Sequence, residues 1–337
     1  MLRHLCKFIF IVCISFYTII ASAQQSNVYT FDKAVSVPGD GGYDYLFIDQ
    51  VNNKLFVSHG ATVNVIDIAT ETVVATISDM KGVHGIATVN SAGKGFISDG
   101  KANSVVVFDI NTFKKIKTIK LSGKKPDAIM YDPFSNKVFA FNGGSDNVSV
   151  IDVDSLKETN VIPLDGAPEF AVSDGRGKIY DNLEDKNLLK TIDSKSLKVI
   201  NTWPLTNCLA PSGLAIDTVN KRLFTVGADS KNLLVLDAES GKIINTLPIG
   251  SGVDAVVFDE ATKLILASCG DGVTTIIKQE SADKYVIVQK LSTPKRARTM
   301  ALDTKTHKIY LSVADFVPGA RTVVPNSFKV LIYKMIQ

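Results

Sequence analysis

Short apolar runs separated by polar turns fill most of the chain, and their order repeats. In one stretch, the apolar run Ala128–Tyr131 leads through the polar turn Asp132–Asn136 to a second apolar run, Val138–Phe141. A loop of Gly, Ser, Asp and Asn then leads to Val148–Ile151, which alternates with period two, and a fourth run ends near Leu164. Runs of this kind, bounded by turn residues and without helical periodicity, are typical of an all-β repeat.

Two series of aspartates give the length of the repeat. One closes the Val-Ile-Asp-like run and recurs every 41 to 44 residues, as Asp67, Asp109, Asp152, Asp193 and Asp237. The other ends the preceding apolar run, as Asp49, Asp132, Asp174, Asp217, Asp259 and Asp303, with Asn90 in its place in the second unit. Four strands in a unit of this length form a propeller blade, whereas the coils of a β-solenoid are shorter. The sequence therefore predicts an all-β fold, a seven-bladed β-propeller of four-stranded blades.

The two ends of the chain predict how the ring closes. The seventh unit starts at Lys295 and ends with the strand Phe328–Tyr333, so it has only three strands of its own. A spare strand, Val28–Val37, precedes the first complete unit. We expect this N-terminal strand to complete the last blade, because that pairing removes an exposed edge.

The repeats resemble the YVTN-type β-propeller family, which includes the secreted YncE-like proteins. The family pattern runs from a Gly-x-x-Pro turn through an apolar strand and an aspartate to a Val-x-Val-Ile-Asp strand, and seven units match it from Asp44 onward. Units three and five match best and carry Pro126 and Pro211. Unit six departs with Lys278 in place of the aspartate, and unit seven with an inserted loop, Ala314–Ser327. The resemblance implies a propeller that serves as a binding or scaffold module, and it leaves the ligand open.

The N-terminus has the features of a secretory signal. Arg3 and Lys7 precede an apolar run, Phe8–Ile20, which leads to the small residues Ala21–Ala23. The alternative is a membrane anchor, but the run is shorter than the roughly 20 residues that span a bilayer. We therefore expect residues 1–23 to be a cleaved signal peptide and residues 24–337 to form one propeller domain in the periplasm or outside the cell.

The charge balance bears on partners. The chain has 37 Lys and Arg against 34 Asp and Glu, and loss of two basic residues with the signal lowers its net charge from +3 to +1. A near-neutral protein has no overall field to attract nucleic acid or an anionic membrane. We therefore expect a monomer whose ligand is a small molecule or a protein. The remaining cysteines, Cys208 and Cys269, lie in different blades, which favours free thiols.

Candidate site residues come from one repeat position. Counting back five residues from the second series of aspartates samples the loops that enter the innermost strands, and it yields Asp44, Gly85, Asp127, Glu169, Ser212, Asp254 and Arg298. Tyr43 and His84 lie one residue earlier, and His59 follows a second strand toward the same face. We predict a ligand-binding mouth formed by Asp44, Asp127, Glu169, Asp254, Arg298, Tyr43, His59 and His84. Oxygen ligands suit Ca²⁺ or another divalent cation, whereas the simpler interpretation is a wet, polar channel end.

Two other functions stay open, and no catalytic residue is assigned. The segment Pro211–Asp217 is similar to the Pro-Asn-Gly pattern of gluconolactonase-type hydrolases, which hold a divalent cation, but Ser212 replaces the asparagine. Lys124, Lys125 and the basic run 295–298 lie near aromatic residues and suggest single-stranded nucleic acid, against which the neighbouring acids argue. The inserted loop Ala314–Ser327 should emerge on the face of the mouth.

Overall fold

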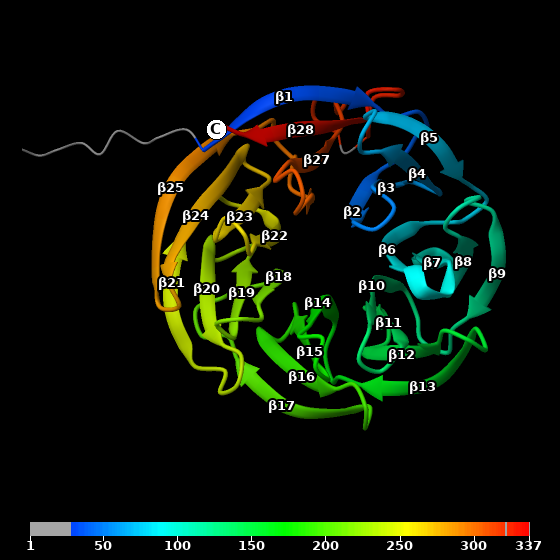
Figure 1. The fold of residues 1–337 in the computed structure, drawn as a ribbon, viewed down its shortest axis with the longest axis horizontal. Coiled ribbons are helices and arrows are strands. Elements are labelled where there is room, and N and C mark those ends of the chain that lie inside the picture. Colours follow the sequence, from blue (N-terminus) through cyan, green and yellow to red (C-terminus); the bar gives the residue numbers. More distant parts are fainter. Residues whose placement is uncertain (1–27, 321, 337) are drawn as a thin grey trace, which may run out of the picture.

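The chain forms a closed ring of seven antiparallel four-stranded blades (Figure 1). The computed structural model describes residues 28–320 and 322–336. The predicted signal peptide therefore lies outside the described residues. Within the described residues, the only helices are two 3₁₀ turns, η1 (Asn90–Ala92) and η2 (Gly100–Ala102), and neither has the length or apolar content to cross a membrane. The predicted all-β propeller is confirmed.

Blades 1 to 6 each contain four consecutive strands, ordered from the ring axis outward. Blades 1 to 3 consist of β2 (Tyr43–Asp49), β3 (Lys54–His59), β4 (Thr62–Asp67) and β5 (Thr72–Ile77); β6 (Val83–Val89), β7 (Lys94–Asp99), β8 (Ser104–Asp109) and β9 (Lys115–Lys120); and β10 (Pro126–Asp132), β11 (Lys137–Asn142), β12 (Asn147–Asp152) and β13 (Lys157–Pro163). Blades 4 to 6 consist of β14 (Pro168–Ser173), β15 (Lys178–Leu183), β16 (Leu188–Asp193) and β17 (Lys198–Pro204); β18 (Pro211–Asp217), β19 (Arg222–Gly227), β20 (Asn232–Asp237) and β21 (Ile243–Pro248); and β22 (Val253–Asp259), β23 (Leu264–Cys269), β24 (Val273–Ser281) and β25 (Lys284–Ser292).

Blade 7 is shared between the two ends of the chain. Its strands run outward from the axis as β26 (Met300–Leu302), β27 (Ile309–Val313), β28 (Lys329–Met335) and the N-terminal β1 (Tyr29–Ser36). β1 pairs antiparallel with β28, and Val35 lies opposite Val330. Figure 1 shows the two strands side by side at the rim. The predicted completion of the last blade by the N-terminal strand is confirmed.

A buried glutamine ties this closing strand to blade 6. Gln289 of β25 accepts hydrogen bonds through Oε1 from the backbone N–H groups of Val28 (2.8 Å) and Tyr29 (2.7 Å). Its Nε2 donates to the carbonyl oxygen of Tyr29 at 2.9 Å. Tyr29 is itself only 1% exposed and packs into the hydrophobic cluster between blades 6 and 7. The first strand is thus held both by its sheet and by the neighbouring blade.

The hydrophobic core lies between the blades. Each cluster of buried apolar residues combines two adjacent blades, as where Leu55 and Val57 of blade 1 pack with Tyr310 and Val330 of blade 7. Seven such clusters among the described residues correspond to the seven interfaces of the ring. Strands in this arrangement bury both faces, which explains the nearly continuous apolar runs of the second and third strands.

The hydrogen bonds of the turn aspartates explain why these residues recur in the repeat. Asp49 accepts hydrogen bonds from the backbone of its own turn and from Asn90 Nδ2 of the next blade, at 3.1 Å. Asp132 does the same with Ser135 and with Ser173 of the next blade, whose Oγ donates at 2.6 Å. One side chain therefore closes a turn and joins two blades.

Glycines allow the innermost strands to approach one another. A Cβ atom on Gly213 would lie 2.7 Å from the backbone nitrogen of Val256 and 2.9 Å from the carbonyl oxygen of Asp254. On Gly85 it would lie 3.0 Å from the carbonyl oxygen of Asp127. A Cβ atom at Gly213 would displace rigid backbone, and one at Gly85 would make a contact tighter than almost all real ones, so both positions favour glycine. The close approach narrows the opening around which the first residues of the strands gather.

Ring closure makes the first strand a stability determinant. A chain that begins at Gly41 lacks β1 and exposes the edge of β28, so it should melt at a lower temperature and aggregate. Thermal melting with light scattering measures both effects. A chain beginning at Ser26 retains β1 and is the matched control. Equal melting of the Gly41 and Ser26 chains would show that the ring closes without this strand.

Candidate functional site

The innermost strands of blades 1 to 6 begin at the same end of the central channel, and we call this end the mouth. One residue of each blade lies there, at what we call the ring position. In blades 1 to 6 this ring position is the second residue of the innermost strand, and in blade 7 it precedes β26 by two residues. The ring positions are Asp44, His84, Asp127, Glu169, Ser212, Asp254 and Arg298. The sequence placed them in the loops before the strands, whereas six of the seven lie within the strands, where backbone pairing holds them.

His84, not Gly85, occupies the ring position of blade 2. Val89 pairs with Lys94 as Asp49 pairs with Lys54, so Asn90 lies one place beyond the end of its strand, in the turn η1. Counting five residues back from Asn90 therefore gave Gly85, one residue after the correct position. Counting ten residues back from the basic residue that begins the second strand finds both Asp44 and His84.

Polar side chains of the second strands fix the backbone of the ring positions. Ser58 Oγ donates to the carbonyl oxygen of His84 in the next blade, and Ser98 Oγ donates to that of Asp127 at 2.5 Å. The carbonyl oxygen of Ser212 accepts from Asn182 Nδ2 at 2.8 Å in the same way. These three ring-position residues are thus held by the preceding blade as well as by their own. This role was not predicted from the sequence, although a small polar residue in the second strand of several units is the signal for it.

Five of the seven ring positions line one cavity of about 220 Å³. Its walls are Asp44, Tyr45, Leu46, Asp127, Glu169, Phe170, Asp254, Ala255, Arg298, Thr299 and Met300. The predicted convergence of four carboxyl groups and one arginine at a single opening is therefore what the structure contains. Ser212 does not line the cavity, because it is buried and its Oγ donates to the carbonyl oxygen of Val253 at 3.1 Å.

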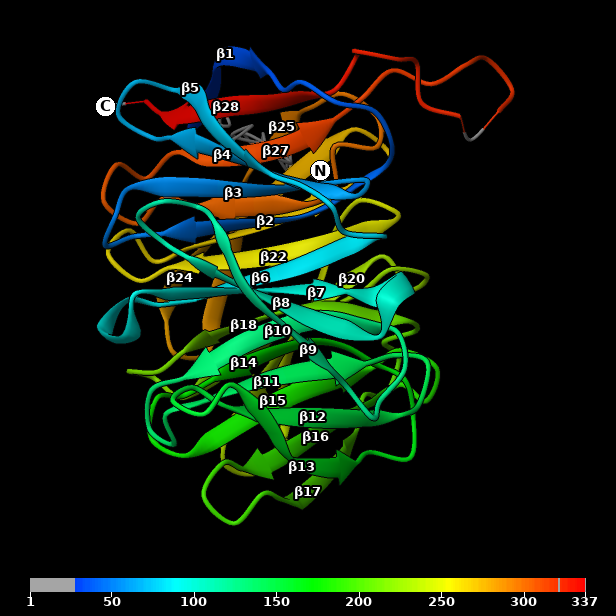
Figure 2. The ribbon, with the colours of Figure 1, turned by 90° about the vertical axis from the view of Figure 1, so that its right-hand side faces the viewer.

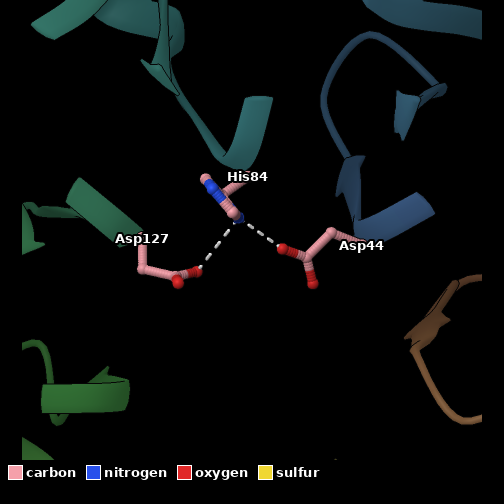
Figure 3. A group of neighbouring side chains, drawn as sticks. All are labelled: Asp44, His84 and Asp127. Atoms are coloured by element: carbon pink, nitrogen blue, oxygen red, sulfur yellow. Dashed lines mark hydrogen bonds and ion pairs between the residues drawn. The ribbon is translucent and has the colours of Figure 1, made fainter. Parts of the chain in front are cut away.

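His84 lies between two of these carboxylates (Figure 3). Its Nδ1 is 2.6 Å from Oδ2 of Asp44 and 3.6 Å from Oδ1 of Asp127. Burial works against the protonated imidazole, but the hydrogen bond to Asp44 and the charge of Asp127 raise the pKa of His84 above its ordinary value. The imidazole thus offsets part of the negative charge on this side of the mouth.

The other carboxyl groups are shifted toward their neutral forms. Burial, followed by the charge of Asp127, raises the pKa of Glu169 to about 9. Burial and the nearby Asp44 raise the pKa of Asp127 to about 6, although His84 opposes the shift. Burial also raises the pKa of Asp254 to about 6, against the influence of Arg298. Each value reports a carboxylate that is poorly solvated and close to others of its kind.

Two of the predicted site residues lie away from the cavity. His59 is 1% exposed, and its ring packs 4.3 Å from that of Phe328, so it belongs to the packing between blades 1 and 7. The last residue of a second strand is covered by the neighbouring blade, which is why its side chain does not reach the mouth. Tyr43 lies further out, where it stacks on Phe328 at 5.3 Å and donates from its hydroxyl group to the carbonyl oxygen of Arg296 at 3.1 Å.

Two aromatic rings form the floor of the cavity. Tyr45 of β2 stacks on Phe170 of β14 across the channel, with ring centroids 5.7 Å apart and planes inclined by 17°. The hydroxyl group of Tyr45 donates to the carbonyl oxygen of Glu169 at 3.2 Å. Both rings also border a second, mainly apolar cavity of about 80 Å³. Both rings therefore line the two cavities, as does Leu46.

A larger outer vestibule of about 800 Å³ adjoins the cavity, with which it shares Asp44, Arg298 and Thr299. Phe316, Thr322 and Val323 of the inserted loop contribute to its wall. The predicted emergence of this loop on the face of the mouth is confirmed, and Figure 2 shows the loop projecting beside blade 7. The guanidinium group of Arg296 lies 3.8 Å from the ring centroid of Phe316, a cation–π contact that joins the loop to the start of the blade.

One group of side chains has the spacing of metal ligands. The ligating atoms of Asp44, His84 and Asp127 all lie within 4.8 Å of one another. Carboxylate and imidazole ligands together suit a transition metal better than Ca²⁺, which takes oxygen ligands. Nδ1 of His84 already bonds to Asp44, so it serves an ion only if that bond opens.

Comparisons with known proteins support the fold but identify no family. No protein-family model and no curated protein sequence matches the chain. A chain of the hydrazine synthase of Kuenenia stuttgartiensis is similar in structure, with a TM-score of 0.71, 14% identity, and coverage of 93% of this chain and 98% of that one. A chain of the mitotic checkpoint complex has a TM-score of 0.77 and 13% identity, and 99% of each chain is covered. At these identities the likeness supports the seven-bladed propeller and nothing finer.

The raised pKa of Glu169 predicts a dependence of stability on pH. When a carboxyl group has a higher pKa in the folded than in the unfolded protein, the free energy of unfolding falls as the pH rises from the unfolded-state pKa toward the folded-state pKa. Glu169→Gln should therefore increase the free energy of unfolding at pH 9 by about 1–3 kcal/mol, the usual cost of an unsatisfied buried polar group, and change it little at pH 4. Urea unfolding at both pH values measures this. Glu260→Gln, at an exposed site on the opposite face, is the control; an equal effect of the two substitutions would contradict the assignment.

Proposed function

We propose that the chain is an exported YVTN-type propeller that serves as a binding module and holds a cationic ligand at its mouth. The observation that carries this proposal is the convergence of four carboxyl groups, from four blades, on one cavity of about 220 Å³. A cavity with a few convergent polar groups and perturbed pKa values is the first place to look for a ligand.

The charges at the mouth favour a cation. Two basic side chains oppose the four carboxyl groups: His84 beside Asp44, and Arg298, whose Nε lies 3.6 Å from Oδ2 of Asp254. Glu169 is left without a basic partner and remains protonated at neutral pH. A cation that binds beside these carboxyl groups favours their ionised form, so their raised pKa values should fall when it binds. Both a divalent metal ion and an organic cation satisfy this requirement.

Export and family membership are supported by the sequence. The basic start, the apolar run Phe8–Ile20 and the small residues Ala21–Ala23 favour cleavage before Gln24. The repeated turn aspartates of the YVTN pattern, such as Asp49 and Asp132, close the turns and join adjacent blades. Secretion of the chain with cleavage after Ala23 would support this part of the proposal.

The two alternative functions have less support at this site. A gluconolactonase-type hydrolase needs a side-chain amide at the place of Ser212, and the hydroxyl group there is buried and bonded to Val253. Single-stranded nucleic acid needs a positive groove, and the cavity presents carboxyl groups where the strand would pass. A binding module for a cation agrees better with the charges that line the mouth.

Replacing Asp127 and Asp254 together with Asn tests the proposal. Cations that bind only the folded state raise its melting temperature, so the unaltered protein should melt higher in CaCl₂ or propylammonium chloride at pH 8 than in NaCl of equal ionic strength. The double variant should lose this response. Without ligand it should melt at the same or a higher temperature, because the substitution removes two poorly solvated charges.

Circular dichroism checks that the double variant retains the β-sheet signal. Asp165→Asn combined with Asp229→Asn, which changes two exposed acids away from the cavity, is the matched control. If neither cation raises the melting temperature of the unaltered protein, or if the double variant responds equally, the mouth is not a cation site.

A further inference from the structure

The volumes of the cavity and of the adjoining vestibule limit the size of a ligand that the mouth can bind. The cavity, at about 220 Å³, is smaller than the roughly 300–1,000 Å³ of sites for drug-sized ligands. The outer vestibule, at about 800 Å³, lies in that range, and it shares Asp44, Arg298 and Thr299 with the cavity. A ligand of ordinary size therefore places only a head group in the cavity and extends into the vestibule.

The walls of the cavity suit an ammonium group on a short hydrocarbon. Asp127, Glu169 and Asp254 present carboxyl oxygens, which accept N–H hydrogen bonds. The stacked rings of Tyr45 and Phe170 form the floor, where they can contact the carbon atoms next to the charge. A metal ion uses the oxygens but has no use for this aromatic floor.

At the rim, an arginine and a carboxylate are poorly paired with each other. Nε of Arg298 and Oδ2 of Asp254 are 3.6 Å apart, which is too far for a hydrogen bond. The Arg298 side chain is 55% exposed, so its planar group of donors can reach an incoming anion, and guanidinium groups bind carboxylates in a two-point geometry. Unlike Arg298, His84 is already hydrogen-bonded to a carboxylate, that of Asp44, at 2.6 Å. A ligand that carries both charges can replace the one loose pair with two well-formed ones.

We propose that the ligand is a zwitterionic primary amine of the amino-acid type, with its ammonium group in the cavity and its carboxylate on Arg298 at the rim. The inference rests on the proposed function and specifies the chemical class of its cation. The ammonium group donates to Asp254, Asp127 and Glu169, and the carboxylate accepts from Arg298. Side groups of the ligand extend into the vestibule, toward Tyr43 and Phe316.

Four small probes of matched size separate the two charges. L-alanine and β-alanine carry both charges at different spacings, propylamine carries only the ammonium group, and propionate carries only the carboxylate. Isothermal titration calorimetry of the mature chain at pH 8 should show that at least one of the two zwitterions binds about tenfold more tightly than propylamine, as expected for one charge-assisted contact. Propionate should not bind. N-trimethylated β-alanine, which lacks N–H donors, should bind less tightly than β-alanine.

Substitution of Arg298 assigns the carboxylate contact. In Arg298→Gln the ratio of zwitterion to propylamine affinity should fall from about ten to about one, because only the rim contact is lost. Arg298→Lys retains the charge without the two-point geometry and should give an intermediate ratio. Arg176→Gln, at an exposed arginine on the opposite face, should leave the ratio unchanged and is the control.

The outcomes distinguish this inference from the proposed function. If propylamine binds as tightly as both zwitterions, or if the ratio survives in Arg298→Gln, the mouth binds a cation but not an amino-acid-type ligand. If CaCl₂ binds and no amine does, the cation is a metal ion, and the inference is again wrong. If neither amines nor CaCl₂ bind, or if binding persists in the variant with Asp127→Asn and Asp254→Asn, the proposed function fails as well.

Discussion

The antiparallel pairing of β1 with β28 is the constraint on which the rest of the structure depends. It converts a row of blades into a ring, which brings the ring positions of the seven blades around one axis. The seven interfaces between blades supply the packing, and Gln289 joins the closing strand to blade 6. Side chains at one fixed repeat position therefore gather around the same opening, and five of the seven line its cavity.

This geometry explains how a near-neutral protein can have an acidic mouth. The whole chain carries similar numbers of basic and acidic residues, but the ring position collects Asp44, Asp127, Glu169 and Asp254, and burial then raises the pKa values of three of them. Such an arrangement costs stability, as functional sites commonly do. Packing and hydrogen bonds between the blades offset that cost, so the fold tolerates a mouth that a cation would stabilise further.

The repeat and the closing strand could be predicted because period-two apolar runs and turn aspartates are local signals that the backbone obeys directly. The carboxyl groups of the mouth followed from the same regularity. His84 was assigned one place away from its register because the turn that follows its strand is irregular. His59 was predicted at the mouth, but it packs on Phe328. The prediction was wrong because the sequence of one repeat does not show which side chains a neighbouring blade buries. The stacking of Tyr45 on Phe170 joins blades 1 and 4 across the axis and depends on the diameter of the ring, which no local pattern encodes.

The most direct test of the account is the pKa of the Glu169 carboxyl group, because that group reports burial and charge at the mouth together. It can be followed by NMR titration of a chain labelled with ¹³C at the glutamate carboxyl carbons, with Glu169→Gln assigning the resonance. The account predicts a pKa of about 9 in the free protein, and a lower value when a primary amine or a divalent cation is bound. A pKa near the ordinary 4.5, unchanged by any cation, would contradict the claim that ring closure forces poorly solvated carboxyl groups into one binding site.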